Sequence, residues 1–232
     1  MIFKITPKNY QNFCNNHLKK MNILLITLII TSLFFILTSP DDYQQGNAVK
    51  IMYIHVPSAW LSLLIYTIIA SLSALSFIYK TPLLTLSAIS LAPIGCIFSL
   101  ITLVTGSLWG KPIWGTWWVW DARLTSMLIL FFLYLSYIIL YKSYSNVITG
   151  SKIAAALAII GFINIPIIKF SVEIWNSLHQ PASILRKDGI SIHTSMLKPL
   201  LISFFTLLVL TFNIFIMRVN IFLIKHKKQR LK

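Results

Sequence analysis

The sequence predicts an all-α polytopic membrane protein with six transmembrane helices and a tryptophan-rich loop on its outer face. The chain of 232 residues is 57% hydrophobic and only 11% charged, whereas about a quarter of the residues of a soluble domain are charged. Six apolar stretches approach the roughly 20 residues that a helix needs to cross the hydrocarbon core. The sequence shows neither the alternation nor the turn rhythm of a membrane β-barrel, so helices are the expected way to satisfy the backbone in lipid.

The six spans are expected near residues 21–39, 57–79, 83–106, 123–141, 153–168 and 199–224. They use the chain from end to end, so a single integral membrane domain without an internal repeat is expected over residues 1–232. The first span is interpreted as a retained helix and not as a signal peptide, because Pro40 would follow the cleavage site at Thr38-Ser39.

Basic residues predict the orientation of the chain. The formal net charge is +15. With six spans both termini share one side, and that side holds 13 basic and no acidic residues, against seven basic and five acidic residues on the other. Because lysine and arginine are enriched in inner loops, both termini are expected in the cytoplasm or the mitochondrial matrix. The orientation signal accounts for the positive net charge, so nucleic-acid binding is not needed to explain it. The expected partner of the basic tail is the lipid bilayer.

The span count places three longer loops outside, near residues 40–56, 107–122 and 169–198, and loops on a rigid scaffold commonly carry function. The middle loop holds five of the seven tryptophans within 12 residues. The spacing of Trp117, Trp120 and Asp121 predicts a short surface helix that leads into the fourth span. Asp121 is expected to cap the first turn of that span. An aromatic belt at the lipid headgroups is the alternative, but a belt scatters its aromatics over many helix ends, so this density favours a binding platform.

Histidines lie on the same expected face. His55 ends the first outer loop, just before Pro57, which suits the first turn of the second span. His179 follows Trp175 by four residues, a spacing that predicts a shared helical face, and His193 lies later in that loop. A loop histidine without function is the commoner case for each position taken alone. One histidine on either side of the tryptophan-rich loop, all on one face, is the combination that favours a ligand site.

Haem is the ligand that these residue types fit best. Aromatic faces stack on a flat apolar ring, a neutral imidazole is an axial ligand for iron, and Arg123 offers a cation to the propionates. Zinc would favour a tighter cluster of His, Cys and carboxylate, and no nucleotide-binding glycine loop is present. Because the chain has no Cys-x-x-Cys-His motif, any haem would be held without thioether bonds. The expected cofactor is haem b, bound non-covalently and transiently.

These residues resemble those of a known family. The segment Trp114–Ser126 looks like the tryptophan-rich WWD signature of haem-handling membrane proteins. The segments Tyr53–Pro57 and Trp175–Pro181 narrow the resemblance to the CcmC family, the haem exporter proteins C of cytochrome c maturation. The resemblance covers nearly the whole chain.

The resemblance implies a protein without enzymatic activity in the bacterial inner membrane or the mitochondrial inner membrane. It implies that haem is presented on the outer, periplasmic face to the haem chaperone CcmE, beside an ABC transporter of CcmA and CcmB and the small protein CcmD. Carried over to this sequence, His55 and His179 are the expected axial ligands of the haem iron, and Arg123 is expected to contact the propionates. The expected haem platform comprises Trp114, Trp117, Trp118, Trp120 and Asp121.

Other functions remain as alternatives at this point. A haem lyase of the same superfamily, such as CcmF or CcsA, would be longer and have more spans. A permease for haem or another solute would carry charges at the membrane midplane, whereas these spans are almost free of charge, with Asn164 and Asn213 as the main polar exceptions. A purely structural subunit would leave the tryptophan cluster unexplained.

Overall fold

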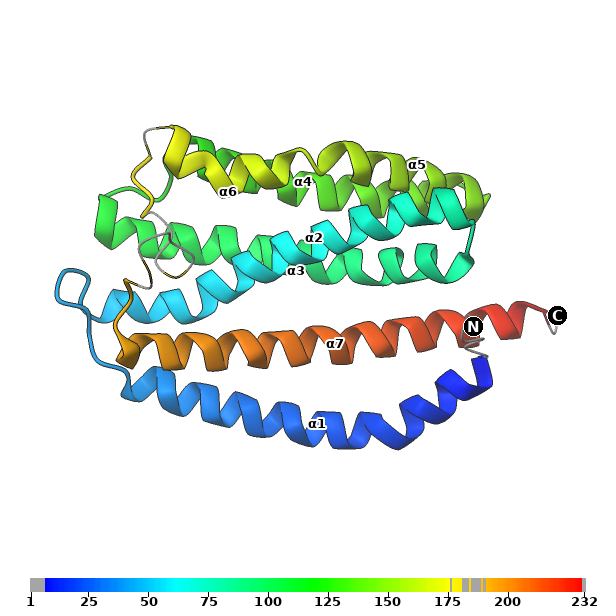
Figure 1. The fold of residues 1–232 in the computed structure, drawn as a ribbon, viewed down its shortest axis with the longest axis horizontal. Coiled ribbons are helices and arrows are strands. Elements are labelled where there is room, and N and C mark those ends of the chain that lie inside the picture. The colour runs from blue at the N-terminus through cyan, green and yellow to red at the C-terminus, as the bar shows by residue number, and fades with distance from the viewer. Residues whose placement is uncertain (1–6, 176, 181–183, 185–188, 190, 231–232) are drawn as a thin grey trace.

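The computed structural model describes residues 7–175, 177–180, 184, 189 and 191–230, which form a bundle of long helices (Figure 1). The elements are α1 (Pro7–Thr38), the 3-10 helix η1 (Asn47–Ile51), α2 (Met52–Tyr79), α3 (Pro82–Trp114), α4 (Ala122–Ser143), α5 (Val147–Gly161), α6 (Asn164–Ile174) and α7 (Thr194–Arg230). Within the described chain, six helical spans are long and apolar enough to cross a membrane. The predicted all-α, six-span membrane architecture is confirmed.

The fifth span consists of two helices, α5 and α6, with a break between them. Pro166 lies in the first turn of α6 and has no N–H to offer the carbonyl of Phe162, so a continuous helix is disfavoured there. The carbonyl of Phe162 instead accepts a bond from the backbone N–H of Ile165 at 3.0 Å. The two pieces still cross the membrane as one span, Thr149–Ile174.

Helices α2 and α3 lie at the centre of the bundle, with α4, α5 and α6 along one side and α7 on the other (Figure 1). Helix α1 packs on α7 at the edge, where Ser32 and Ser203 share a hydrogen bond of 3.0 Å. Lipid removes most of the hydrophobic driving force between helices, so packing and such bonds, each contributing about 0.6–2 kcal/mol, hold the bundle together. Helix α1 begins and α7 ends at the same end of the bundle. We call the opposite end, which carries residues 39–46, 115–121, 177–180 and 191–193 of the connections between helices, the loop end.

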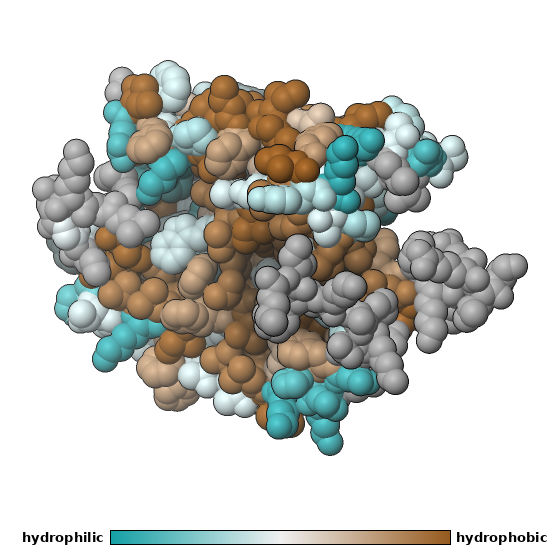
Figure 2. Space-filling view, turned by 45° about the vertical axis from the view of Figure 1, so that its right-hand side comes forward, coloured by the Kyte–Doolittle hydropathy of each residue, from teal (hydrophilic) through white to brown (hydrophobic). Residues whose placement is uncertain are grey.

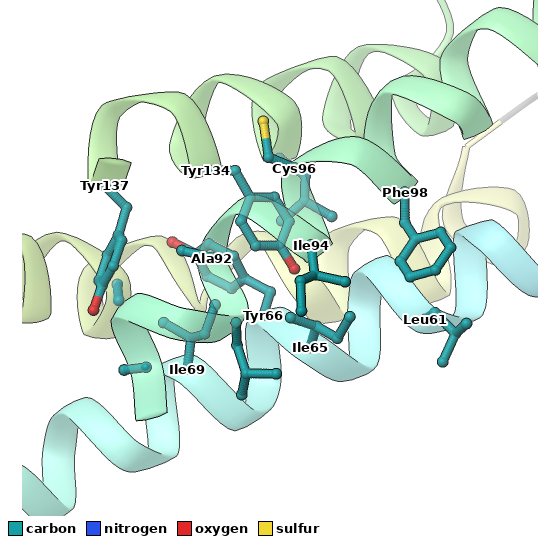
Figure 3. Packing of buried hydrophobic residues seen from close by; sticks show 14 of the residues in the cluster. Leu61, Ile65, Tyr66, Ile69, Ala92, Ile94, Cys96, Phe98, Tyr134 and Tyr137 are labelled. Carbon is teal, nitrogen blue, oxygen red and sulfur yellow. The ribbon is translucent and has the colours of Figure 1, made fainter. Parts of the chain in front are cut away.

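Tyrosines from two helices fix the centre of the bundle. The rings of Tyr66 and Tyr134 meet edge to face, with centroids 5.1 Å apart, amid apolar side chains of α2, α3 and α4 (Figure 3). The hydroxyl of Tyr134 donates to the carbonyl of Ser62 at 2.6 Å, which ties α4 to α2. This packing holds α2, α3 and α4 together at the centre of the bundle.

The surface matches a lipid environment. Hydrophobic side chains cover most of the face seen in Figure 2, and hydrophilic ones lie toward its margins. Helix α1 exposes isoleucine, leucine and phenylalanine along its length, for example Ile30 and Phe34. A soluble protein would not leave such a surface open to water, so the chain is a multi-pass membrane protein.

The middle outer loop is shorter than the sequence suggested, and the expected surface helix is absent. Helix α3 continues through Gly110 and Pro112 to Trp114, because membrane helices tolerate both residue types. Gly115 then ends α3 in the left-handed conformation, with φ 74°, where a Cβ would be strained. In the following segment the hydroxyl of Thr116 bonds to both the backbone N–H and the carbonyl of Trp118, which competes with helical bonding.

Two further local expectations are wrong. Helix α2 begins at Met52, so His55 lies in its first turn and not at the end of the preceding loop, and Pro57 lies beyond the first turn. Helix α6 ends at Ile174 and Trp175 is extended, with φ −119° and ψ 150°, so Trp175 and His179 do not share a helical face. The hydroxyl of Ser177 bonds instead to the Asp121 carboxylate and to the backbone N–H of His179, which draws the chain across to α4. Asn176 and Pro181 of the third-loop segment lie outside the described residues.

Candidate functional site

A cavity of about 480 Å³ opens at the loop end between α2, α3, α4 and α6, closed on one side by residues that precede and begin α7. This volume falls in the range of about 300–1,000 Å³ that is usual for small-molecule sites. The lining is mostly apolar, with a few polar groups. It comprises Gln45, Met52, His55, Val56, Ala59, Trp60, Leu63, Thr102, Leu103, Gly106, Ser107, Trp109, Gly110, Ile113, Trp114, Trp118, Arg123, Leu124, Met127, Ile168, Lys169, Leu178, His179, Gln180, Ile184, Ile192 and Leu200.

His55 enters the cavity from the first turn of α2 and is 8% exposed. Its Nδ1 lies 3.0 Å from the hydroxyl oxygen of Thr105 on α3, and its ring meets the edge of Trp109 with centroids 5.6 Å apart. Gly106 allows this approach, because a Cβ there would lie 3.0 Å from Cε1 of His55. Helix α3 therefore sets the position of the imidazole.

His179 enters the cavity from the opposite side, from the segment between α6 and α7. Its backbone N–H donates to the hydroxyl of Ser177 at 3.1 Å, and that hydroxyl donates to the Asp121 carboxylate. Its Nδ1 lies 3.2 Å from Nη1 of Arg123 and 3.0 Å from the backbone carbonyl oxygen of Gln180. Burial, with the positive charge of Arg123 beside it, lowers the pKa of His179. The lowered pKa favours the neutral imidazole, the form that binds metals.

The fold brings the two histidines together. The ring centroids of His55 and His179 are 6.4 Å apart and their planes are inclined by 32°. Trp114 lies beside this pair, with its ring centroid 6.2 Å from that of His179. Two imidazoles with indole rings around them, at the mouth of an apolar cavity, form a site suited to a large aromatic ligand that carries a metal.

The tryptophans of the predicted platform divide into two groups. Trp114 and Trp118 line the cavity. Trp118 also carries a buried indole N–H without a hydrogen-bond partner in the described structure, which is a donor left for an acceptor on a ligand. Trp117 and Trp120 do not line the cavity and are 55% and 77% exposed. They lie on the connection between α3 and α4, beyond the lining of the cavity.

The two charged residues of the signature have different roles. Asp121 is 9% exposed and does not line the cavity. Its carboxylate accepts the backbone N–H of Leu124 at 2.7 Å, which confirms the predicted helix cap, and it also accepts the hydroxyl of Ser177. Arg123 does line the cavity, and its Nε donates to Ser171 on α6 at 3.3 Å. Asp121 thus positions the His179 segment, while Arg123 offers a guanidinium to whatever the cavity holds.

Comparison with known proteins agrees with this geometry. The model of the family described as heme exporter protein C matches residues 2–232. The chain belongs to this family. It is 48% identical to the heme exporter protein C of Bradyrhizobium diazoefficiens over 80% of this chain and 72% of that protein. The heme exporter protein C of Haemophilus influenzae is 47% identical over 81% and 75%, and a ccmC-like mitochondrial protein of Marchantia polymorpha is 52% identical over 75% and 73%.

Several residues that line the cavity or contact its histidines were not predicted as part of the site. Trp109 belongs to the same run of tryptophans as Trp114, so its inclusion could have been anticipated. Trp60 follows His55 within α2, but the sequence offers no sign that it faces the same cavity as this histidine. Thr105 and Gly106 carry no sequence signal, since their importance depends on how α2 crosses α3.

Proposed function

We propose that this protein binds haem non-covalently in the loop-end cavity, between His55 and His179, and hands it to the haem chaperone CcmE on the outer face of the membrane. Membership in the heme exporter protein C family supports the coarser part of this proposal, a role in haem handling for cytochrome c maturation. The observation that carries the finer part is the distance of 6.4 Å between the ring centroids of the two histidines.

This distance suits two imidazoles that coordinate one iron from opposite sides. Each metal–nitrogen bond is about 2 Å long and the ring centre lies about 1 Å beyond the nitrogen, so the two centres should be about 6 Å apart. His55 and His179 reach that separation although they come from α2 and from the segment before α7. Both histidines line the same ligand-sized cavity.

The remaining wall of the cavity suits the porphyrin. The indole rings of Trp109 and Trp114 flank the histidines and offer aromatic surface to an aromatic ring. The guanidinium of Arg123 and the unpartnered N–H of Trp118 supply donors for propionate oxygens. The protein binds and orients the haem and performs no covalent chemistry of its own.

The orientation and the partners follow from the same proposal. The loop end faces the periplasm or the mitochondrial intermembrane space, because the opposite end carries the basic surplus. The membrane is the bacterial inner membrane or the mitochondrial inner membrane. The chain works beside an ABC transporter of CcmA and CcmB, with CcmD. Residues 1–232 of this chain form a single integral membrane domain.

The structure favours a protein that binds haem at the membrane surface over a permease that carries a solute across the membrane. Asn164 donates to the carbonyl of Ser126 at 2.9 Å, and Asn213 donates to Asn22 at 3.3 Å. These two asparagines therefore bind other helices, and neither lines the cavity. A polar pathway through the midplane would instead leave such groups facing water or a solute.

The decisive experiment is purification of the protein with and without CcmE, followed by absorption spectra and a haem assay. Wild-type protein should carry haem with the spectrum of bis-imidazole coordination, and this haem should pass to added CcmE. Protein that is folded and in the membrane but carries no haem, even when haem is supplied, would rule out the proposed function.

A further inference from the structure

The two histidines differ in the hydrogen bonds of their Nδ1 atoms, and this difference concerns iron binding. A neutral imidazole carries one proton, so one ring nitrogen donates and the other accepts. A histidine can offer Nε2 to a metal only when its proton is on Nδ1, and the partner of Nδ1 therefore decides whether the ring can act as a ligand.

His55 is held in the iron-binding tautomer. The hydroxyl of Thr105 has a single proton, which it donates to the carbonyl of Ile101 at 2.6 Å. The Thr105 oxygen, 3.0 Å from Nδ1 of His55, must then accept. His55 is the donor in this contact, so its proton is on Nδ1 and the lone pair of Nε2 is free.

His179 has two incompatible partners at Nδ1. Arg123 can only donate, so its Nη1 at 3.2 Å calls for a lone pair on Nδ1 and places the proton on Nε2. The carbonyl oxygen of Gln180, at 3.0 Å, can only accept and calls for a proton on Nδ1. Both contacts cannot be satisfied at once. While Arg123 donates to His179, Nε2 of this histidine is protonated and unable to bind iron.

We propose that Arg123 is a switch that makes iron ligation by His179 depend on a free carboxylate of the porphyrin. A carboxylate that binds Arg123 draws the guanidinium away from Nδ1. His179 then places its proton on Nδ1, donates to the Gln180 carbonyl, and frees Nε2 for the iron. His55 needs no such trigger. This inference rests on the proposed function and adds a selectivity to it: the site distinguishes iron porphyrins with free propionates from those without them.

The direct test compares haem with its dimethyl ester, which keeps the iron and the ring and lacks the two negative charges. Wild-type protein should bind haem as a six-coordinate, low-spin complex. It should bind the ester as a five-coordinate, high-spin complex through His55 alone, with the spectrum of His179→Ala loaded with haem. A six-coordinate ester complex in wild-type protein would overturn the switch and leave the proposed function intact. Failure to bind either porphyrin would overturn both.

Variants test each histidine separately. Arg123→Ala removes the donor that blocks His179, so the ester should become six-coordinate in this variant. An ester complex that stays five-coordinate would show that Arg123 is not the block. Thr105→Val should lower the affinity for the ester by about 10-fold or more, the usual effect of losing a hydrogen bond behind a metal-binding histidine. Thr211→Val is its matched control, because Thr211 is buried in α7 and donates to the carbonyl of Leu207 in its own helix. Equal effects of the two threonine variants would overturn the role of Thr105.

Discussion

The imidazole ring centroids of His55 and His179 lie 6.4 Å apart, and residues from other helices contact both rings. Thr105 on α3 holds the ring of His55. The connection from Asp121 through Ser177, together with Arg123 at the start of α4, holds His179. The site is therefore assembled by α3 and α4, and substitutions on these two helices should act on the histidines.

The proposed delivery of haem requires that the loop end of the bundle lies outside the cytoplasm. A reporter that is active only outside the cytoplasm should be active when fused after Trp114 or after Gln180, because both positions lie at the loop end. Fused after Lys232 it should be silent, since the surplus of basic residues keeps that end inside. Activity only at the Lys232 fusion would place the cavity on the cytoplasmic side and remove the proposed delivery to an outer partner.

Arg123 should contribute to haem retention through its charge and its fork of donors. Hydrogen bonds to charged groups contribute about 1.5–3 kcal/mol, so Arg123→Ala should weaken haem binding by about 10- to 100-fold. Arg123→Lys should recover part of this loss, because it keeps the charge and loses the bidentate geometry. Haem per molecule of purified protein is the measurement. Reduced protein abundance with normal haem per molecule would show that Arg123 only anchors α4 to α6.

Substitutions of cavity-lining and exposed tryptophans should differ in their effect on haem affinity. Trp114→Ala removes a ring that lines the cavity beside His179, and should weaken haem binding several-fold, in line with the about 0.5–1.5 kcal/mol of an aromatic contact. Trp120→Ala is the matched control, since Trp120 is 77% exposed and lies outside the cavity lining. An equal loss in Trp120→Ala would mean that the binding surface extends over the connection between α3 and α4.

Gly106 offers a way to move His55 without removing it. A Cβ at position 106 would lie 3.0 Å from Cε1 of His55, so the imidazole must shift by a few tenths of an ångström. Gly106→Ala should change the haem spectrum and reduce binding, although alanine is the better helix former and should not destabilise α3 by itself. A spectrum and affinity identical to wild type would show that the ring of His55 is not constrained by α3.

The sequence predicted the fold well because the bilayer imposes it: a backbone in lipid must be helical, and apolar runs of the right length reveal where. Asp121 as a helix cap was predictable for a similar local reason, since the bond to the N–H of Leu124 spans three residues. The end of α3 was not predictable, because glycine and proline end helices in water far more reliably than in membranes.

The site was predicted only in outline. Residue chemistry pointed to His55, His179 and the tryptophan run, and the cavity contains both histidines. Which tryptophans face inward depends on the irregular connection after Gly115, whose course is set by hydroxyl bonds of Thr116 that no periodicity reveals. The roles of Thr105 and Ser177 arise from contacts between distant segments, and a single sequence carries no trace of them.

The two histidines provide the final prediction, which tests the binding mechanism most directly. Aromatic contacts hold the ring independently of the iron bond, so His55→Ala and His179→Ala should each retain some haem. Each should shift the spectrum and block transfer to CcmE, because one axial position is lost. Added imidazole should partly restore binding by filling that position. Spectra are recorded on protein purified with CcmE, with and without imidazole.

His193→Ala is the matched control for these two variants. His193 is exposed, bonds to Ser195 at 2.7 Å and does not line the cavity, so its loss should leave haem binding and transfer near wild type. Unchanged spectra and normal CcmE loading in both His55→Ala and His179→Ala would show that neither histidine is a ligand. Failure of His193→Ala alone would show that the segment before α7 supplies a different ligand to the iron, and that the 6.4 Å approach of His55 to His179 serves packing only.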